Sequence, residues 1–110
     1  VDLRRPRGST RVFATSDVHF DHGYNDDWAY TIDPRAFQDD VLIVAGNLAE
    51  TRIAVMRALT TLKSKFRRVF YTVGNHELRI GHSEASRLPD SVAKLHALLA
   101  ACDELGVDVF

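Results

Sequence analysis

Three short stretches of this sequence carry side chains that could bind a metal ion. They are S-D-V-H with Asp17 and His19, A-G-N-L-A-E with Asn47, and V-G-N-H-E with Asn75 and His76. Carboxylate and amide oxygens together with imidazoles suit several divalent ions, including Mn, Fe, Zn and Mg. Each stretch taken alone is more often a polar turn than a set of ligands. That three predicted strands in succession end in this way favours one shared site over three unrelated turns.

Each stretch follows a short apolar run that is typical of a buried strand. The runs begin at Arg11, Asp40 and Arg68, and they consist of β-branched, aromatic and small residues bounded by turn formers. In parallel α/β sheets, ligands gather beyond the carboxyl ends of the strands. Three successive strands that end in polar side chains therefore predict one shared site.

Two amphipathic helices are predicted over residues 50–66 and 88–106, because apolar residues recur there at steps of three and four. A fourth strand is predicted to begin in the last four residues, V-D-V-F. This alternation of strand and helix predicts an α/β fold, with layered sheets flanked by helices. The predicted apolar stripes are Ile53, Met56, Leu59, Leu62 and Phe66, and then Val92, Leu95, Leu98, Leu99, Cys102 and Leu105.

Composition bounds the class of protein. The chain has 110 residues, of which 45% are hydrophobic and 26% charged, and its net charge is -1. These values predict one globular domain, or part of one, over residues 1–110, and they give no signal for nucleic-acid binding. No apolar run is long enough to span a membrane, so a soluble intracellular protein, cytoplasmic or organellar, is expected.

Three smaller features are interpreted as structural. Residues 1–10 are basic and are expected to form a frayed terminus. Cys102 is the only cysteine, which excludes an internal disulfide, and it is expected to be a small buried hydrophobe. Asp39 and Asp40 are expected to be solvated charges, and His22 is expected to be a loop histidine and not a third ligand.

In this order and spacing the motifs resemble the calcineurin-like metallophosphoesterase superfamily. Its pattern is D-x-H, G-D-x-x-D/E and G-N-H-D/E, followed by a later His and G-H-x-H, and G-N-H-E is the most specific string present here. The motifs cover about residues 11–79, and the order of strands and helices extends the likeness to Phe110. The resemblance implies two stacked sheets flanked by helices, two metal ions and hydrolysis of phosphate mono- or diesters. This chain would then be the N-terminal half of an αββα sandwich.

The resemblance also implies a role for each matching residue. Four side chains would bind metal: Asp17 and His19 the first ion, Asn75 the second, and Asn47 both. His76 would face the scissile phosphate as general acid or electrostatic stabiliser. Glu50 and Glu77 match acidic positions that support the ligands.

Two departures from the pattern lower the expected activity. Asn47 stands where the family has a bridging Asp, so a charged shared ligand becomes neutral and at most one weakly bound ion is expected. The later His and the G-H-x-H motif do not occur in these 110 residues, and His82 and His96 do not replace them. We therefore expect a weakly active or inactive chain.

Three functions remain open on this basis. The first is the N-terminal half of a phosphoesterase that acts on a phosphate ester. The second is a degenerate domain, a pseudoenzyme that serves as a structural or interaction subunit and has a protein partner over the missing half. The third is a phosphate- or nucleotide-binding module without turnover. The full reading frame would separate the first from the second.

Overall fold

A four-stranded parallel sheet forms the centre of the computed structural model, which describes residues 9–80, 84–85 and 88–109. The strand order is β1-β2-β3-β4, and helices connect successive strands, which confirms the predicted α/β class. The strands are β1 (Val12–Thr15), β2 (Val41–Ala45), β3 (Arg68–Thr72) and β4 (Asp108–Val109). The helices are α1 (Asp26–Thr31), α2 (Arg52–Lys65) and α3 (Ser91–Leu105).

Residue types at the helix ends explain where the two long helices begin and stop. Thr51 caps α2, because its hydroxyl oxygen accepts a hydrogen bond of 3.2 Å from the backbone N–H of Ala54. Asp90 caps α3 in the same way through the N–H of Ala93 at 2.8 Å. Gly106 ends α3 in the left-handed conformation, with φ 72°. These ends agree with the predicted helix boundaries.

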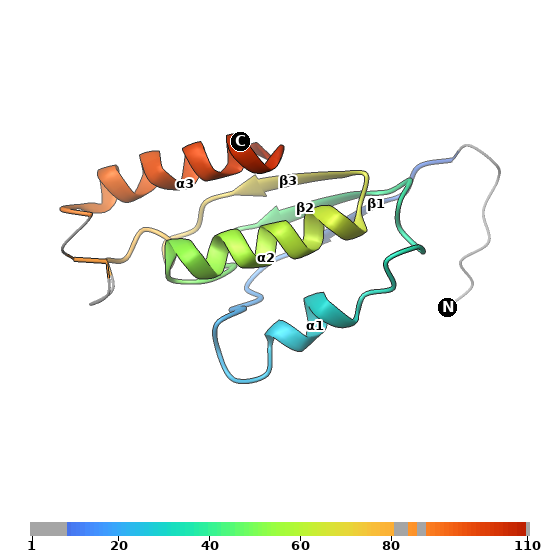
Figure 1. Ribbon diagram of the computed structural model, residues 1–110, viewed down its shortest axis with the longest axis horizontal. Coiled ribbons are helices and arrows are strands. Elements are labelled where there is room, and N and C mark those ends of the chain that lie inside the picture. The colour runs from blue at the N-terminus through green and yellow to red at the C-terminus, as the bar shows by residue number, and fades with distance from the viewer. Residues whose placement is uncertain (1–8, 81–83, 86–87, 110) are drawn as a thin grey trace.

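One face of the sheet packs against the helices and holds the core. The register pairs Leu42 with Val69 and Val44 with Tyr71, and all four side chains are buried. In Figure 1, α2 lies between α3 and α1, and α2 makes contacts with both of them. The buried residues that α2 and α3 add to this core are Val55, Ala58, Leu59, Leu62, Leu98 and Cys102.

The opposite face of the sheet is only partly buried. Ile43 and Phe70 are side by side in the register and retain solvent exposure, and Val12 on the outer strand β1 is 64% exposed. The helices of the described residues cover the core face, and they do not bury this second face to the same extent.

The predicted helical stripes were right only in part, since the misses include both first turns and also the middle of α3, whereas Phe66 at the end of α2 is buried as predicted. Leu59, Leu62, Leu98 and Cys102 are buried, whereas Ile53, Val92 and Leu99 are exposed. Ile53 lies in the first turn of α2, beside the six-residue helix α1, which is too short to cover it. Ile53 instead lines an open apolar hollow between α1 and α2 together with Tyr30 and Met56.

Asp40 is fully buried, which corrects the prediction that it is a solvated charge. Its carboxylate accepts hydrogen bonds from the backbone N–H of Arg11 at 3.0 Å and from the Arg11 guanidinium at 2.9 Å. Its carbonyl oxygen accepts from the N–H of Arg67 at 2.9 Å. Asp40 thus joins the entries of β1, β2 and β3, a role that sequence pattern alone does not reveal.

Two further observations bear on the class of protein. Cys102 is buried on α3, as predicted, and burial raises the pKa of its thiol to about 11. Within the described ranges, no helix combines the length and the apolar character that crossing a membrane requires. Residues 1–8, His82 and Phe110, about which the sequence made predictions, lie outside the described residues.

Candidate functional site

The chain turns sharply where β1 and β2 end. Asp17, His19 and Asn47 all have positive φ, at 54°, 48° and 52°. Asn and Asp tolerate this left-handed conformation better than most residues, whereas His19 adopts it at some conformational cost. Non-glycine residues held in this sparsely populated conformation cluster at functional sites.

Gly74 allows the loop after β3 to approach the loop after β2. A Cβ atom on Gly74 would stand 2.4 Å from Oδ1 and 2.5 Å from the backbone nitrogen of Asn47. No real Cβ occupies such a position, so only glycine fits between β3 and Asn47. The glycine of G-N-H-E is therefore explained by a close approach of two backbones.

Asn47 lies at the centre of the strand ends and is bonded in both directions. Its Nδ2 donates to Oδ1 of Asp17 at 2.8 Å, and its Oδ1 accepts from the backbone N–H of His76 at 3.1 Å. The backbone N–H of His19 donates to the carbonyl of Asn47 at 3.2 Å. The hydrogen bond from Asn47 is the largest cause that lowers the pKa of Asp17, and a bond from Ser16 adds to it.

Three imidazoles gather next to this cluster. The ring centroids of His19 and His76 are 5.0 Å apart, and those of His19 and His22 are 5.4 Å apart. The sequence had assigned His22 to a loop. It does lie in the loop after β1, but its ring is part of the group. The only signal for this in the sequence is its position three residues after His19.

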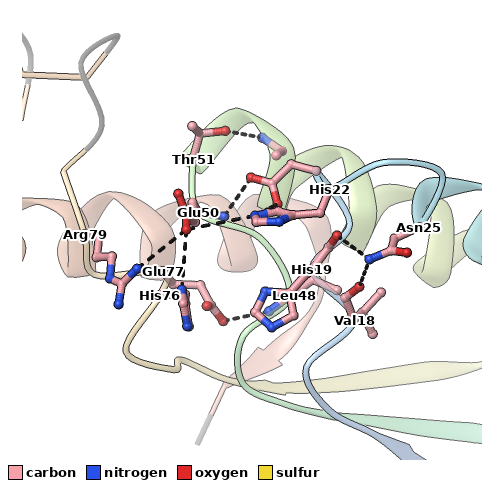
Figure 2. Close-up of polar contacts among 12 residues, drawn as sticks. Val18, His19, His22, Asn25, Leu48, Glu50, Thr51, His76, Glu77 and Arg79 are labelled. Atoms are coloured by element: carbon pink, nitrogen blue, oxygen red, sulfur yellow. Dashed lines mark hydrogen bonds and ion pairs between the residues drawn. The ribbon is translucent and has the colours of Figure 1, made fainter.

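Glu50 links the histidines through its carboxylate. Its Oε1 lies 3.4 Å from Nδ1 of His76, 3.7 Å from a guanidinium nitrogen of Arg79 and 4.0 Å from Nε2 of His22. Figure 2 draws these contacts around Glu50 as dashed lines. A carboxylate on Nδ1 orients an imidazole and leaves its Nε2 for other partners. Glu50 is therefore placed to orient His76.

Glu77 is buried and supports the loops from below. Its Oε1 accepts from the backbone N–H of Leu48 at 3.1 Å, from the hydroxyl of Tyr71 at 2.8 Å and from the N–H of Gly74 at 3.3 Å. The bond to Leu48 is drawn in Figure 2. Glu77 therefore ties the loop after β3 to the loop after β2.

Lys94 is a supporting residue that sequence reasoning missed. It is fully buried on α3, and its Nζ donates to the carbonyl oxygens of Glu50 and Arg79. The same Nζ pairs with the Glu84 carboxylate at 2.9 Å. A lysine at this helical spacing is usually solvated, so nothing in the sequence distinguishes it.

Asn75 and the hollow near the site complete the geometry. Asn75 is exposed and lies between Gly74 and His76, both of which approach Asn47. An open hollow of about 330 Å³ lies beside Asp17, and Trp28 and Asn25 line its other side. Asp17 is the only predicted ligand on the walls of this particular hollow. The strand ends thus bring Asp17, His19, Asn47 and His76 together, with Asn75 at the rim.

The donor atoms show how far this arrangement suits divalent metal ions. Nδ1 of His19 is buried and has no hydrogen-bond partner within the described part of the chain, which suits a ligand. However, across those same residues no three His, Cys, Asp or Glu side chains are gathered closely enough to hold an ion. Asn47 also turns its NH2 group, a donor, toward Asp17. The residues as arranged therefore do not fit a bridged pair of ions.

Comparison with known proteins places this chain in a family. A family model described as calcineurin-like phosphoesterase matches residues 10–109. Because this match covers most of the chain, the chain belongs to the calcineurin-like phosphoesterase family. That membership confirms the resemblance drawn from the three motifs.

Two comparisons point to the same relative. The chain is 34% identical over 96 residues to "[Acyl-carrier-protein] phosphodiesterase PptH" of Mycobacterium tuberculosis, a match that covers 87% of this chain and 29% of that protein. It also resembles the crystal structure of phosphopantetheinyl hydrolase PptH from Mycobacterium tuberculosis, with a TM-score of 0.76 and 33% identity. That match covers 91% of this chain and 35% of the solved chain. The 110 residues thus span about a third of the length of these relatives.

Proposed function

We propose that the strand ends of this chain form part of a phosphoric ester hydrolase site. The observation that carries this proposal is the convergence of three motifs. Asn47 bonds to Asp17 on one side and to the backbone of His76 on the other, and His19 lies against His76. These contacts support one site at the carboxyl edge of a parallel sheet, where ligands of such sheets bind.

The residues would divide the work as follows. Asp17 and His19 would hold a divalent ion and Asn75 would offer an amide oxygen, whereas Asn47, the fourth predicted ligand, turns its NH2 group toward Asp17. When bound, divalent ions stabilise the negative charge that develops on a phosphoryl group. His76 would meet the leaving-group oxygen as proton donor or electrostatic stabiliser. It would be oriented by Glu50, at 3.4 Å from its Nδ1.

The names of the relatives suggest which substrate to test first. PptH is named as a phosphodiesterase of acyl carrier protein and as a phosphopantetheinyl hydrolase. The identity of 34% extends over 87% of this chain. We therefore propose phosphodiesters that carry a phosphopantetheinyl group as the first candidates, before simple monoesters.

Asn47 is expected to limit activity in this chain. An amide in place of a shared carboxylate removes one negative charge from between two dications. At an effective dielectric constant of about 20, the attraction between unit charges about 4 Å apart is about 4 kcal/mol, before desolvation is subtracted. We expect the chain to bind at most one ion, weakly, through Asp17 and His19, and to show little or no turnover.

Calorimetric titration with Mn²⁺ and Zn²⁺ tests ion binding, and hydrolysis of a phosphodiester that carries a phosphopantetheinyl group, with the monoester para-nitrophenyl phosphate for comparison, tests turnover. The unmodified chain and the Asn47→Asp variant should be measured side by side. We expect stronger ion uptake by the variant but little turnover, because the later histidines of the family pattern are not among these 110 residues. Tight binding of two ions, or clear turnover, by the unmodified chain would show that the interpretation of Asn47 is wrong.

The partly buried face of the sheet favours a second candidate function. This face carries Val12, Ile43 and Phe70, which keep part of their apolar surface exposed. The described helices bury the core face more fully than this one. Such surface suits a protein partner. The chain would then act as a structural or interaction subunit with a degenerate site. This candidate requires a chain that remains folded without metal, whereas turnover on a phosphodiester would favour the hydrolase.

A further inference from the structure

We infer that Asn47 fastens the three strand ends to one another without a metal ion. We call its two side-chain hydrogen bonds, to Asp17 and to the backbone N–H of His76, the Asn47 bridge. The bridge stands at the position where the family pattern has a carboxylate shared by two ions. It goes beyond the proposed function because it concerns how the metal-free chain holds its site together.

The chemistry of an amide explains why this bridge needs no ion. An Asn side chain has a donor group and an acceptor oxygen, whereas an ionised Asp has acceptors only. Asp17 requires a donor and the N–H of His76 requires an acceptor, so Asn47 satisfies both at once. A carboxylate at position 47 would face the Asp17 carboxylate at about the same 2.8 Å separation that the amide bond now has. Two carboxylates this close need a cation or a proton between them.

The backbone around Asn47 holds its side chain in this position. Its φ of 52° is a conformation that Asn tolerates. Gly74 has no Cβ atom and so leaves room for Oδ1 of Asn47. A Cβ added to Gly74 would stand only 2.4 Å from that oxygen. Two backbone hydrogen bonds of 3.2 Å also join the loops after β1 and β2. The N–H of Asp17 donates to the carbonyl of Gly46, and the N–H of His19 donates to the carbonyl of Asn47. The side chain is thus bonded at both ends and closely packed in between.

The test compares thermal unfolding of the 110-residue chain and three variants, each in EDTA and in Mn²⁺. Asn47→Gly removes both bonds of the bridge without backbone strain, because glycine accepts positive φ. Asn47→Asp keeps the acceptor for His76 but replaces the donor to Asp17 with a second carboxylate. The double variant Asp17→Asn with Asn47→Asp exchanges donor and acceptor, so that the amide at position 17 can donate to the carboxylate at position 47.

We expect Mn²⁺ to raise the unfolding temperature of the unmodified chain only slightly above its value in EDTA, because at most one weakly bound ion is expected. In EDTA, Asn47→Gly and Asn47→Asp should each unfold at least about 4 °C lower, the shift typical of a loss of about one hydrogen bond in a domain of this size. In EDTA, the double variant should recover most of the unfolding temperature that Asn47→Asp loses. A nonspecific loss of stability from the substitutions would not produce this recovery.

The inference is overturned if Asn47→Asp is as stable as the unmodified chain in EDTA. It is equally overturned if EDTA lowers the unfolding temperature of the unmodified chain as much as that of Asn47→Asp, or if the double variant is no more stable in EDTA than Asn47→Asp. Mn²⁺ should raise the unfolding temperature of Asn47→Asp. If Mn²⁺ fails to do so while the EDTA results hold, the proposed ion site fails and the Asn47 bridge stands, so the two ideas are separable.

Discussion

At the scale of the residue, Glu77 concentrates three hydrogen bonds on one buried oxygen. One of them comes from the Tyr71 hydroxyl at 2.8 Å, and both side chains are fully buried. Tyr71→Phe should lower the free energy of unfolding by about 1–3 kcal/mol, because a buried carboxylate loses a donor. Tyr24→Phe is the matched control, since Tyr24 is 87% exposed, and it should change stability by less than about 0.5 kcal/mol. Urea denaturation measures both, and equal effects would contradict the prediction.

The same tyrosine predicts a loss of stability at high pH. Burial, followed by the charge of Glu77, raises the pKa of Tyr71 above its ordinary value of 10.0. The folded state therefore keeps Tyr71 neutral, and its contribution is fully present below pH 10 and falls as the unfolded chain ionises above it. Between about pH 9 and pH 11, the difference in stability between the unmodified chain and Tyr71→Phe should shrink, by up to about 1.4 kcal/mol per pH unit above the ordinary pKa. A constant difference would count against this assignment.

Gly74 and Gly23 give a matched pair for the close approach at the strand ends. Gly74→Ala would push a methyl group into Asn47, whereas a Cβ on Gly23 meets nothing within 4 Å. Gly74→Ala should therefore cost about 3 kcal/mol or more, through overpacking. Gly23→Ala should cost about 1–2 kcal/mol, because its φ of 57° is strained for alanine. Chemical denaturation compares the two, and a harmless Gly74→Ala would show that the loops are not packed as described.

The sequence predicted part of the site for a clear physical reason. Parallel strands end at one edge of the sheet, so polar residues after each of three strands had to meet there, and Asp17, His19 and Asn47 do lie with His76. Their roles in catalysis remain predictions. The ring of His22 and the ammonium group of Lys94 could not be predicted to lie there, because a loop path and the burial of a helical lysine depend on tertiary packing.

At the scale of the element, α3 supports the site through Lys94. Its buried ammonium group joins the carbonyl oxygens of Glu50 and Arg79 and pairs with the Glu84 carboxylate. Lys94→Met should lower the free energy of unfolding by about 3–5 kcal/mol, since it breaks a buried ion pair. Lys63→Met, at a solvent-exposed bond to Arg67, should cost less than about 1 kcal/mol. Similar losses in thermal denaturation would mean that α3 does not hold these loops.

The helices also show where prediction by pattern ends. Strand and helix order followed from the alternation of apolar runs, and the two long helices lie within the predicted ranges 50–66 and 88–106. Which apolar residues are buried depends on what lies beside each turn. Ile53 matches the stripe but is 61% exposed, because the short helix α1 does not reach over it. The periodicity of apolar residues shows which side of a helix is apolar, and the neighbouring elements decide how many residues of that side are buried.

At the scale of the whole molecule, the sheet has one covered face and one partly buried face, with β1 and β4 at the edges of the described sheet. Edge strands and apolar sheet faces of this kind favour association between chains. We therefore expect the 110-residue chain to associate with itself or with a partner at high concentration. Light scattering after size-exclusion chromatography measures this, and a monodisperse monomer would contradict the expectation.

Substitutions at Val12 and Ile53 test whether the sheet causes this association. Both are apolar and similarly exposed, at 64% and 61%, but Val12 lies on the edge strand β1 and Ile53 on the helix α2. Val12→Lys places a charge on the edge and should increase the fraction of monomer, because a lysine there opposes strand pairing and burial of the sheet face. Ile53→Lys adds the same charge on the helical side and should leave association unchanged. If both variants reduce association equally, net charge and not the sheet is the cause, and the partner surface has to be sought elsewhere.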